Sequence, residues 1–257
     1  MQLTNSDARQ IRFPGWAAPA ALVFLVFGST VSCLGNSWVQ DDLTLIRYAP
    51  LAHTLAQPWI HFTQSYWPAP YARDLYRPLT SLSFAVEWVL GGGHAVVFRI
   101  VSVLLYLGTT LALYRLAKRI VSPGAAWLAA ALFAVHPVHV EAVAVAVNQA
   151  ELIVGALLAL LMTAYIDRRQ GELQLSSRWT LAMTGGYLLA LLFKEHAILL
   201  PALMVTAELT VIRDLRPWRQ RMASLRRLFL WLLLVAVVFV GVRTLALHGN
   251  TKGSFTA

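Results

Sequence analysis

The stretch from residue 16 to residue 42 reads WAAPAALVFLVFGSTVSCLGNSWVQDD, a long apolar run that ends in two adjacent acids. Residues 16–34 are long enough to cross a bilayer, since a helical span needs about 20 apolar residues. Backbone polar groups in lipid must be paired within their own segment, so a helix is the expected conformation. Asp41 and Asp42 therefore follow directly on a predicted membrane helix.

Apolar runs of this kind recur along the whole chain. The sequence is 58% hydrophobic and 13% charged, with a mean hydropathy of +0.61, values outside the range of soluble domains. The net charge of +9 comes from Lys and Arg residues in short clusters between apolar runs, which is how membrane proteins encode orientation. We predict an integral membrane protein that does not bind nucleic acid.

The spacing of the apolar runs predicts an all-α membrane protein, a helical bundle with about seven spans in a single transmembrane domain over residues 1–257. His136-Pro137 divides one run that is too long for a single helix. The chain is either a compact protein or the N-terminal part of a longer one. The predicted spans are 16–34, 95–116, 121–136, 142–166, 179–193, 197–212 and 228–246.

Basic residues mark the cytoplasmic side of a membrane protein. With the N-terminus in the cytoplasm, the basic clusters at 9–12, 115–119, 168–178 and 213–227 all fall on that side. We therefore expect a multi-pass protein of the inner (plasma) membrane whose polar site faces the periplasm. Residues 35–94 form a long external loop, in which the short apolar stretch 79–90 is expected to lie as a helix in the membrane interface.

Asp41 and Asp42 have two interpretations. Acids favour the first turn of a helix, so the pair could cap a helix that begins at Leu43. Alternatively, one carboxylate is a general base that takes the proton of an attacking hydroxyl, while the other orients it or binds substrate. The sequence leaves open which of the two would be the base.

Arg77 is the main candidate for an anion contact on the external side. Four other basic residues on that side could serve the same purpose: Arg73, Arg99, Lys194 and Arg243. An arginine fork matches phosphate oxygens and could stabilise a phosphate leaving group. The alternative for Arg77 is a side chain that reaches from the bilayer to the interface. Lys194 and Glu195 join two predicted spans, and an ion pair between these two neighbours would also account for them.

The segment His136-Pro137-Val138-His139-Val140-Glu141 lies at another external helix end. Two histidines and an acid suggest a metal such as zinc, although Pro137 disrupts the helical spacing and no further pair completes a ligand set. On a helix from 142 onward, Asn148 and Glu151 fall within about 80° of Glu141. This predicts a polar stripe, which either binds substrate or forms hydrogen bonds between helices.

The order of these motifs is similar to that of the TMTC family, the transmembrane and tetratricopeptide-repeat O-mannosyltransferases. The resemblance covers about residues 35–210 and rests on four motifs, Asp41-Asp42, Tyr-Arg-Pro-Leu-Thr at 76–80, His-Pro-Val-His-Val-Glu-Ala-Val at 136–143 and Lys-Glu at 194–195. Two departures stand out. Gln149 replaces a basic residue that relatives often carry before the Ala-acid pair, and the tetratricopeptide repeats are absent, so a protein acceptor is not implied.

The resemblance implies a GT-C fold and an inverting glycosyltransferase whose donor is a sugar, such as mannose, on a polyprenyl phosphate. It implies no obligatory cofactor and makes a divalent metal optional. The expected partners are membrane lipid, the polyprenyl-phosphate sugar and an acceptor protein or glycolipid. Asp41 and Asp42 are then the catalytic residues. The implied substrate-binding residues are Tyr76, Arg77, His136, His139, Glu141, Asn148, Glu151, Lys194 and Glu195.

Two other functions fit the same pattern. The external polar groups could line the path of a membrane transport or lipid-binding component, although no inverted halves are visible in the sequence. The chain could also be a truncated relative without activity that acts as a scaffold.

Overall fold

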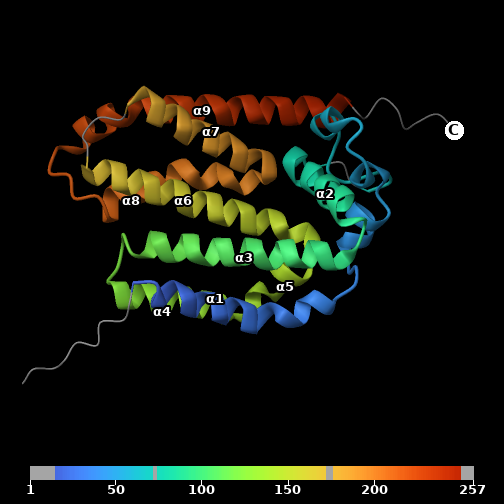
Figure 1. The fold of residues 1–257 in the computed structure, drawn as a ribbon. Helices are drawn as coiled ribbons and strands as arrows, with labels where there is room; N and C mark the ends of the chain where they lie inside the picture. Colours follow the sequence, from blue (N-terminus) through green and yellow to red (C-terminus); the bar gives the residue numbers. More distant parts are fainter. Residues whose placement is uncertain (1–14, 72–73, 172–175, 250–257) are drawn as a thin grey trace, which may run out of the picture.

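The computed structural model describes residues 15–71, 74–171 and 176–249, and within these ranges the regular structure is helical, with no strand. Figure 1 shows long helices that run side by side, with shorter pieces gathered at one end of the bundle. The long helices are α1 (Ala17–Thr30), α3 (Ala95–Ala117), α4 (Pro123–Val135), α6 (Gln149–Gly171), α7 (Ser177–Phe193), α8 (Leu200–Thr210) and α9 (Trp218–Gly249).

Four described segments are long and apolar enough to cross a membrane, Ala17–Gly35, Ala95–Ala117, Ala146–Gly171 and Trp218–Leu247. A fifth is counted if α4 and its continuation Pro137–Ala144, which bends by 50°, form one broken span. The remaining two predicted spans correspond to α7 and α8, helices of 17 and 11 residues. The chain is an all-α membrane protein, while seven spans remain a prediction.

Helix α3 lies at the centre of the bundle, where it packs against α1, α4 and α6, and α7 packs between α6 and α9. Buried aromatic residues such as Tyr165 on α6 and Tyr187 on α7 fill the contacts that α7 makes with its neighbours. On α9, by contrast, Leu233 and Val237 are exposed. Apolar surface on the outside of a bundle is what a helix facing lipid requires.

The long apolar run after Ser122 breaks where the sequence predicts, because Pro137 cannot continue α4. A short turn η5 (Pro137–His139) and helix α5 (Val140–Ala144) follow. Val145 is then extended, with φ −112° and ψ 113°, before turn η6 (Ala146–Asn148) leads into α6. The prediction of one continuous helix from residue 142 is therefore wrong, and so is the polar stripe derived from it.

The segment between α1 and α3 covers one end of the bundle with short turns and one helix (Figure 1). These are η1 (Val31–Gly35), η2 (Leu43–Arg47), η3 (Pro50–His53), η4 (Pro58–Phe62) and helix α2 (Pro78–Gly91). Helix α2 ends at Gly92, whose φ of 60° lies in the left-handed region that glycine adopts at little cost. A helix thus forms at the predicted stretch 79–90, and its place in the membrane interface stays a prediction.

The opposite end of the bundle holds the described residues of three basic clusters, 115–119, 168–178 and 213–227, while the cluster at 9–12 lies outside the described residues. Arg119 on α3 pairs with Asp167 on α6, and Glu208 on α8 pairs with both Arg169 and Arg221. These clusters are the ones that the sequence assigns to the cytoplasmic side. The described basic clusters therefore share one end of the bundle, as predicted, and the orientation in a membrane stays a prediction.

Candidate functional site

Asp42 is fully buried in the segment that follows α1. Its Oδ2 accepts a hydrogen bond from Arg99 Nη2 at 2.7 Å, and its Oδ1 accepts one from the backbone N–H of Val147 at 3.0 Å. Neither Asp42 nor Arg99 exposes any side-chain surface. Asp42 makes no capping hydrogen bond with its side chain, so it ties the external segment to α3 and to the turn before α6 instead of capping a helix.

Asp41 has the opposite environment. Its side chain is exposed, and among the described residues its carboxylate forms no hydrogen bond or ion pair. The preceding residue, Gln40, has a φ of 48°, an uncommon value for a residue other than glycine. The backbone therefore turns sharply at Gln40, and Asp41 is the member of the acid pair that a substrate can reach.

The Tyr76–Thr80 motif attaches helix α2 to the end of α7. Pro78 occupies the first turn of α2, where its missing N–H costs nothing. Thr80 Oγ1 donates to the carbonyl of Phe193 at 2.6 Å, and the hydroxyl of Tyr76 donates to the carbonyl of Phe62 at 3.0 Å. Tyr76 is only 2% exposed. Its predicted role in binding substrate is therefore corrected to one of holding the loop.

Arg77 is placed by this docking beside Glu195, at the turn that follows α7. Its Nε and Nη2 donate to the two carboxylate oxygens at 2.9 and 2.5 Å. Burial alone would raise the pKa of Glu195, but the hydrogen bonds and charge of Arg77 outweigh it and the pKa is lowered. Glu195 is therefore ionised, and the paired groups remain partly exposed.

Lys194 pairs with Glu151, in the first turn of α6, and not with its neighbour Glu195. The ion pair between Lys194 and Glu195 that the sequence offered as an alternative is thus not formed. His196 Nδ1 lies 3.6 Å from Glu151 Oε2, and burial lowers the pKa of His196. Two ion pairs, Arg77–Glu195 and Lys194–Glu151, therefore meet at the turn after α7, and we call them the paired-charge cluster.

Tyr66 contacts this cluster and is influenced by the charges of the acid pair, although no sequence motif pointed to it. The guanidinium carbon of Arg77 lies 5.2 Å from the centroid of the Tyr66 ring, a favourable cation–π contact. Burial raises the pKa of the Tyr66 hydroxyl; Arg77 opposes this effect, and the charges of Asp41 and Asp42 add to it. Arg77 and both acids therefore lie close enough to Tyr66 to act on it electrostatically.

The predicted residues of the 136–148 segment lie apart from the cluster. His139 packs against Phe133 and Tyr106, with ring centroids 4.1 and 5.7 Å away, and the exposed His136 lies beside it. Both line a cavity of about 350 Å³ with residues of α1 and α3. No described contact joins them to Arg77 or Lys194.

Glu141 is exposed, and its backbone carbonyl accepts a hydrogen bond of 3.4 Å from Asn148 Nδ2. Asn148 thus bonds back to the start of α5 and does not form a stripe with Glu151. Of the other cations, Arg243 Nη2 donates to the carbonyl of Asp74, and Arg73 lies outside the described residues. Among the described residues, no group of three or more His, Cys, Asp or Glu side chains is arranged to hold a metal ion.

Gln149 is buried in a second polar network, away from the cluster. Its Nε2 donates to Glu87 Oε2 at 3.0 Å and to the carbonyl of Phe98 at 3.1 Å. Burial raises the pKa of Glu87 to about 7, and the hydrogen bond from Gln149 opposes the shift. A basic residue at position 149 would thus face Glu87.

We expect Glu87→Gln to stabilise the protein at alkaline pH. Because the pKa of Glu87 is higher in the folded state than its ordinary 4.5, the folded protein loses stability as pH rises from about 4.5 to about 7, roughly 3 kcal/mol in all. The amide stays neutral and removes this loss. Thermal unfolding in detergent at pH 5 and 8.5 measures it, with the exposed Glu141→Gln as control. A variant with the pH dependence of the unchanged protein would contradict the assignment.

Together, these features define a class: an α-helical membrane protein with an exposed carboxylate and two paired cations at the loop-covered end of its bundle. Residues 78–240, more than half of the chain, match the family model described as dolichyl-phosphate-mannose-protein mannosyltransferase. The chain belongs to this family. The matched range includes Glu151, Lys194 and Glu195 and begins one residue after Arg77.

Curated relatives carry the same family name. The chain is 35% identical over 208 residues to protein O-mannosyl-transferase Tmtc2 of Drosophila melanogaster, covering 76% of this chain and 21% of the relative. It is 31% identical over 241 residues to human TMTC4, which covers 82% of this chain and 32% of the relative. It is 33% identical over 159 residues to human TMTC1, which covers 58% of this chain and 18% of the relative. The resemblance to the TMTC family is thus confirmed, and the chain spans 18 to 32% of these relatives' length. No solved structure matches the chain.

Proposed function

We propose that the protein transfers a mannosyl group from a polyprenyl-phosphate donor to a hydroxyl group of a protein. The observation that carries the proposal is the paired-charge cluster, whose Arg77 contacts Tyr66, at the same loop-covered end of the bundle as the exposed Asp41. Its supports are the family match and the names of the relatives, which are protein O-mannosyl-transferases. The site would face the side of the inner membrane opposite the basic clusters, the periplasm.

Arg77 and Lys194 would bind the phosphate of the donor. In the structure their charges are held by Glu195 and Glu151, whose side chains are 38% and 43% exposed, so an incoming phosphate can compete for the cations. The bidentate geometry that Arg77 shows toward a carboxylate also suits phosphate oxygens. The carboxylates thus hold the two cations in place until the donor arrives.

Asp41 would be the general base. It takes the proton of the acceptor hydroxyl while that oxygen attacks the anomeric carbon and the bond from this carbon to the phosphate oxygen breaks. The electron pair of that bond leaves with the polyprenyl phosphate, whose charge Arg77 and Lys194 stabilise. Asp42, Arg99 and the backbone of Val147 would act indirectly by fixing the segment that carries Asp41.

Transfer of labelled mannose to a serine- and threonine-containing peptide, by the full-length protein in vesicles supplied with polyprenyl-phosphate mannose, tests the proposal. The proposal predicts a mannosylated peptide. Correctly folded protein that forms no product with this donor, or that forms it from a sugar nucleotide instead, would contradict it.

Arg77→Gln is expected to raise the KM for the donor about tenfold or more, because a charge-assisted hydrogen bond to phosphate is lost. The KM for the acceptor should change little. Arg243→Gln is the matched control, since Arg243 contacts a backbone carbonyl outside the cluster. An unchanged donor KM in Arg77→Gln would remove Arg77 from the donor site.

A further inference from the structure

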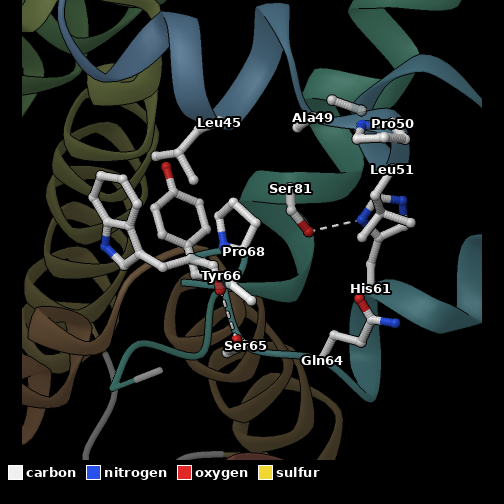
Figure 2. Close-up of a pocket in the computed structure, with 13 residues that line it drawn as sticks. Leu45, Ala49, Pro50, Leu51, His61, Gln64, Ser65, Tyr66, Pro68 and Ser81 are labelled. Carbon is white, nitrogen blue, oxygen red and sulfur yellow. Dashed lines mark hydrogen bonds between the residues drawn. The ribbon is translucent and has the colours of Figure 1, made fainter. Parts of the chain in front are cut away.

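A cavity of about 390 Å³ lies between the η2–η3 segment, the chain from His61 to Ala69 and the start of α2. Figure 2 shows Tyr66 and Pro68 on one side of it and His61 and Leu51 on the other, with Ser81 between them. The volume lies within the range of ligand sites, about 300–1,000 Å³. The residues Gln64 and Ala69 at its edge are exposed, so the cavity is reached from outside.

Among the described residues, the lining of the cavity combines aliphatic side chains such as Leu45 and Leu51 with polar and aromatic ones, and it includes no carboxylate, lysine or arginine. Its polar groups are the side chains of His61, Gln64, Ser65, Tyr66 and Ser81, together with the indole of Trp67. Burial lowers the pKa of His61, which favours a neutral ring. A phosphate would find no opposite charge here, whereas an uncharged ligand with hydroxyl and amide groups would find both hydrogen-bonding partners and aromatic faces.

His61 and Ser81 form the polar centre of the cavity. His61 Nδ1 and Ser81 Oγ lie 2.7 Å apart (Figure 2), while the carbonyl of Pro78 accepts a longer hydrogen bond from Ser81 Oγ at 3.3 Å. His61 is 2% exposed, and its Nε2 has no partner in the part of the chain that the structure describes. Ser81 Oγ keeps acceptor capacity beyond these two contacts, so a ligand hydroxyl or amide that enters the cavity can donate a hydrogen bond to it.

Tyr66 places this cavity next to the proposed catalytic groups. It lines the cavity, and its ring also contacts Arg77 of the paired-charge cluster. Leu45, four residues after Asp41 and in the turn that Asp41 leads into, lines the cavity as well. One wall of the cavity therefore belongs to the turn that Asp41 leads into.

We propose that this cavity binds an uncharged segment of the acceptor polypeptide and presents its serine or threonine hydroxyl to Asp41. The second part of this proposal, presentation of the hydroxyl to Asp41, rests on the proposed function. The donor sugar is the other uncharged candidate, but it is bonded directly to the phosphate and must lie at Arg77 and Lys194, neither of which lines the cavity. The cavity is thus left for the acceptor.

The test is photocrosslinking by the full-length protein in vesicles, with benzoylphenylalanine replacing Gln64 at the cavity edge. The probe is a biotinylated, uncharged decapeptide rich in serine and threonine. The proposal predicts peptide capture at position 64, competed by unlabelled peptide, and little capture with the same substitution at Leu132, on the exposed face of α4. Capture at neither position, or equal capture at both, would overturn the proposal, as would capture of labelled donor in place of peptide.

Two matched variants assign the contact to the polar centre. Ser81→Ala, in the protein that carries the probe at position 64, is expected to reduce peptide capture about three- to tenfold, the equivalent of one hydrogen bond. Ser83→Ala should have no effect, because Ser83 lies on the same helix but bonds to the carbonyl of Thr80, outside the cavity. Equal capture by both variants would remove Ser81 and its partner His61 from the proposed site.

Crosslinking also separates the two proposals, since it requires no donor and no turnover. Peptide capture without any mannosyl transfer would leave the acceptor cavity standing and contradict the proposed function. The opposite result is mannosyl transfer without peptide capture, with an acceptor KM that is unchanged in Ser81→Ala and in His61→Phe. It would support the proposed function and refute the acceptor cavity.

Discussion

Asp41→Asn is expected to reduce mannosyl transfer by about 100- to 10,000-fold, the usual contribution of a general base. The amide has nearly the shape of the acid but cannot take a proton from the acceptor hydroxyl. Because the Asp41 side chain is exposed and has no partner among the described residues, folding should be unaffected. Rates with saturating donor and acceptor, measured on equal amounts of folded protein, provide the test.

The control for this change is Asp74→Asn, a second exposed carboxylate of the external segment. It should leave transfer within about twofold, as surface substitutions away from a site usually have small effects. Full activity of Asp41→Asn would exclude Asp41 as the base. Equal losses in both variants would mean that the external segment as a whole, and not one carboxylate, determines the rate.

Arg99→Met is expected to destabilise the protein by about 3–5 kcal/mol, because the carboxylate of Asp42 is then buried without its cation. Asp42→Leu should cost a similar amount by leaving the guanidinium unpaired. The double variant should cost far less than the sum, about 1–3 kcal/mol, since two backbone groups, the N–H of Val147 and the carbonyl of Ser37, then lose their partners but no charge is left buried. Reversible unfolding in detergent gives the three free energies.

Even in the buried pair, Nε and Nη1 of Arg99 have no partners within the described chain. Replacing both residues by apolar ones should therefore destabilise the protein less than replacing either residue alone. The coupling energy of the double-mutant cycle isolates the interaction. Free energies that simply add would show that Asp42 and Arg99 stabilise the fold independently. The external segment would then need another anchor.

Much of the helical framework follows from the sequence, because lipid leaves few alternatives to a helix for an apolar run. The break at Pro137 is also readable, since proline cannot supply the N–H that a continuing helix requires. The second break, at Val145, carries no such signal. Val145 becomes extended so that the N–H of Val147 can reach Asp42, a tertiary contact that helix periodicity does not contain.

The partners of the charged residues were less predictable. The sequence brings Arg77, Lys194, Glu195 and Glu151 to one end of the bundle, but it does not specify which cation meets which carboxylate. That choice depends on Thr80, whose hydroxyl fixes the start of α2 on the last carbonyl of α7. Asp41 and Asp42 are adjacent and chemically identical, and the contacts of Arg99 and of the Val147 N–H distinguish the buried acid from the exposed one.

Tyr66 and His61 were missed because a tyrosine or histidine in an aromatic-rich external loop is the expected composition of a membrane interface. Their significance comes from neighbours distant in the sequence, Arg77 for Tyr66 and Ser81 for His61. A motif search does not find such pairs, since nothing in the local spacing differs from that of an interfacial loop.

The most direct measurement of the central claim is a structure of the full-length protein in a bilayer with bound polyprenyl-phosphate mannose. We predict the phosphate within hydrogen-bonding distance of Arg77 and Lys194, displacing at least one of their carboxylate partners, with the carboxylate of Asp41 on the opposite side of the anomeric carbon. A phosphate bound at the other end of the bundle, among Arg119, Arg169 and Arg216, would contradict the assignment of the site.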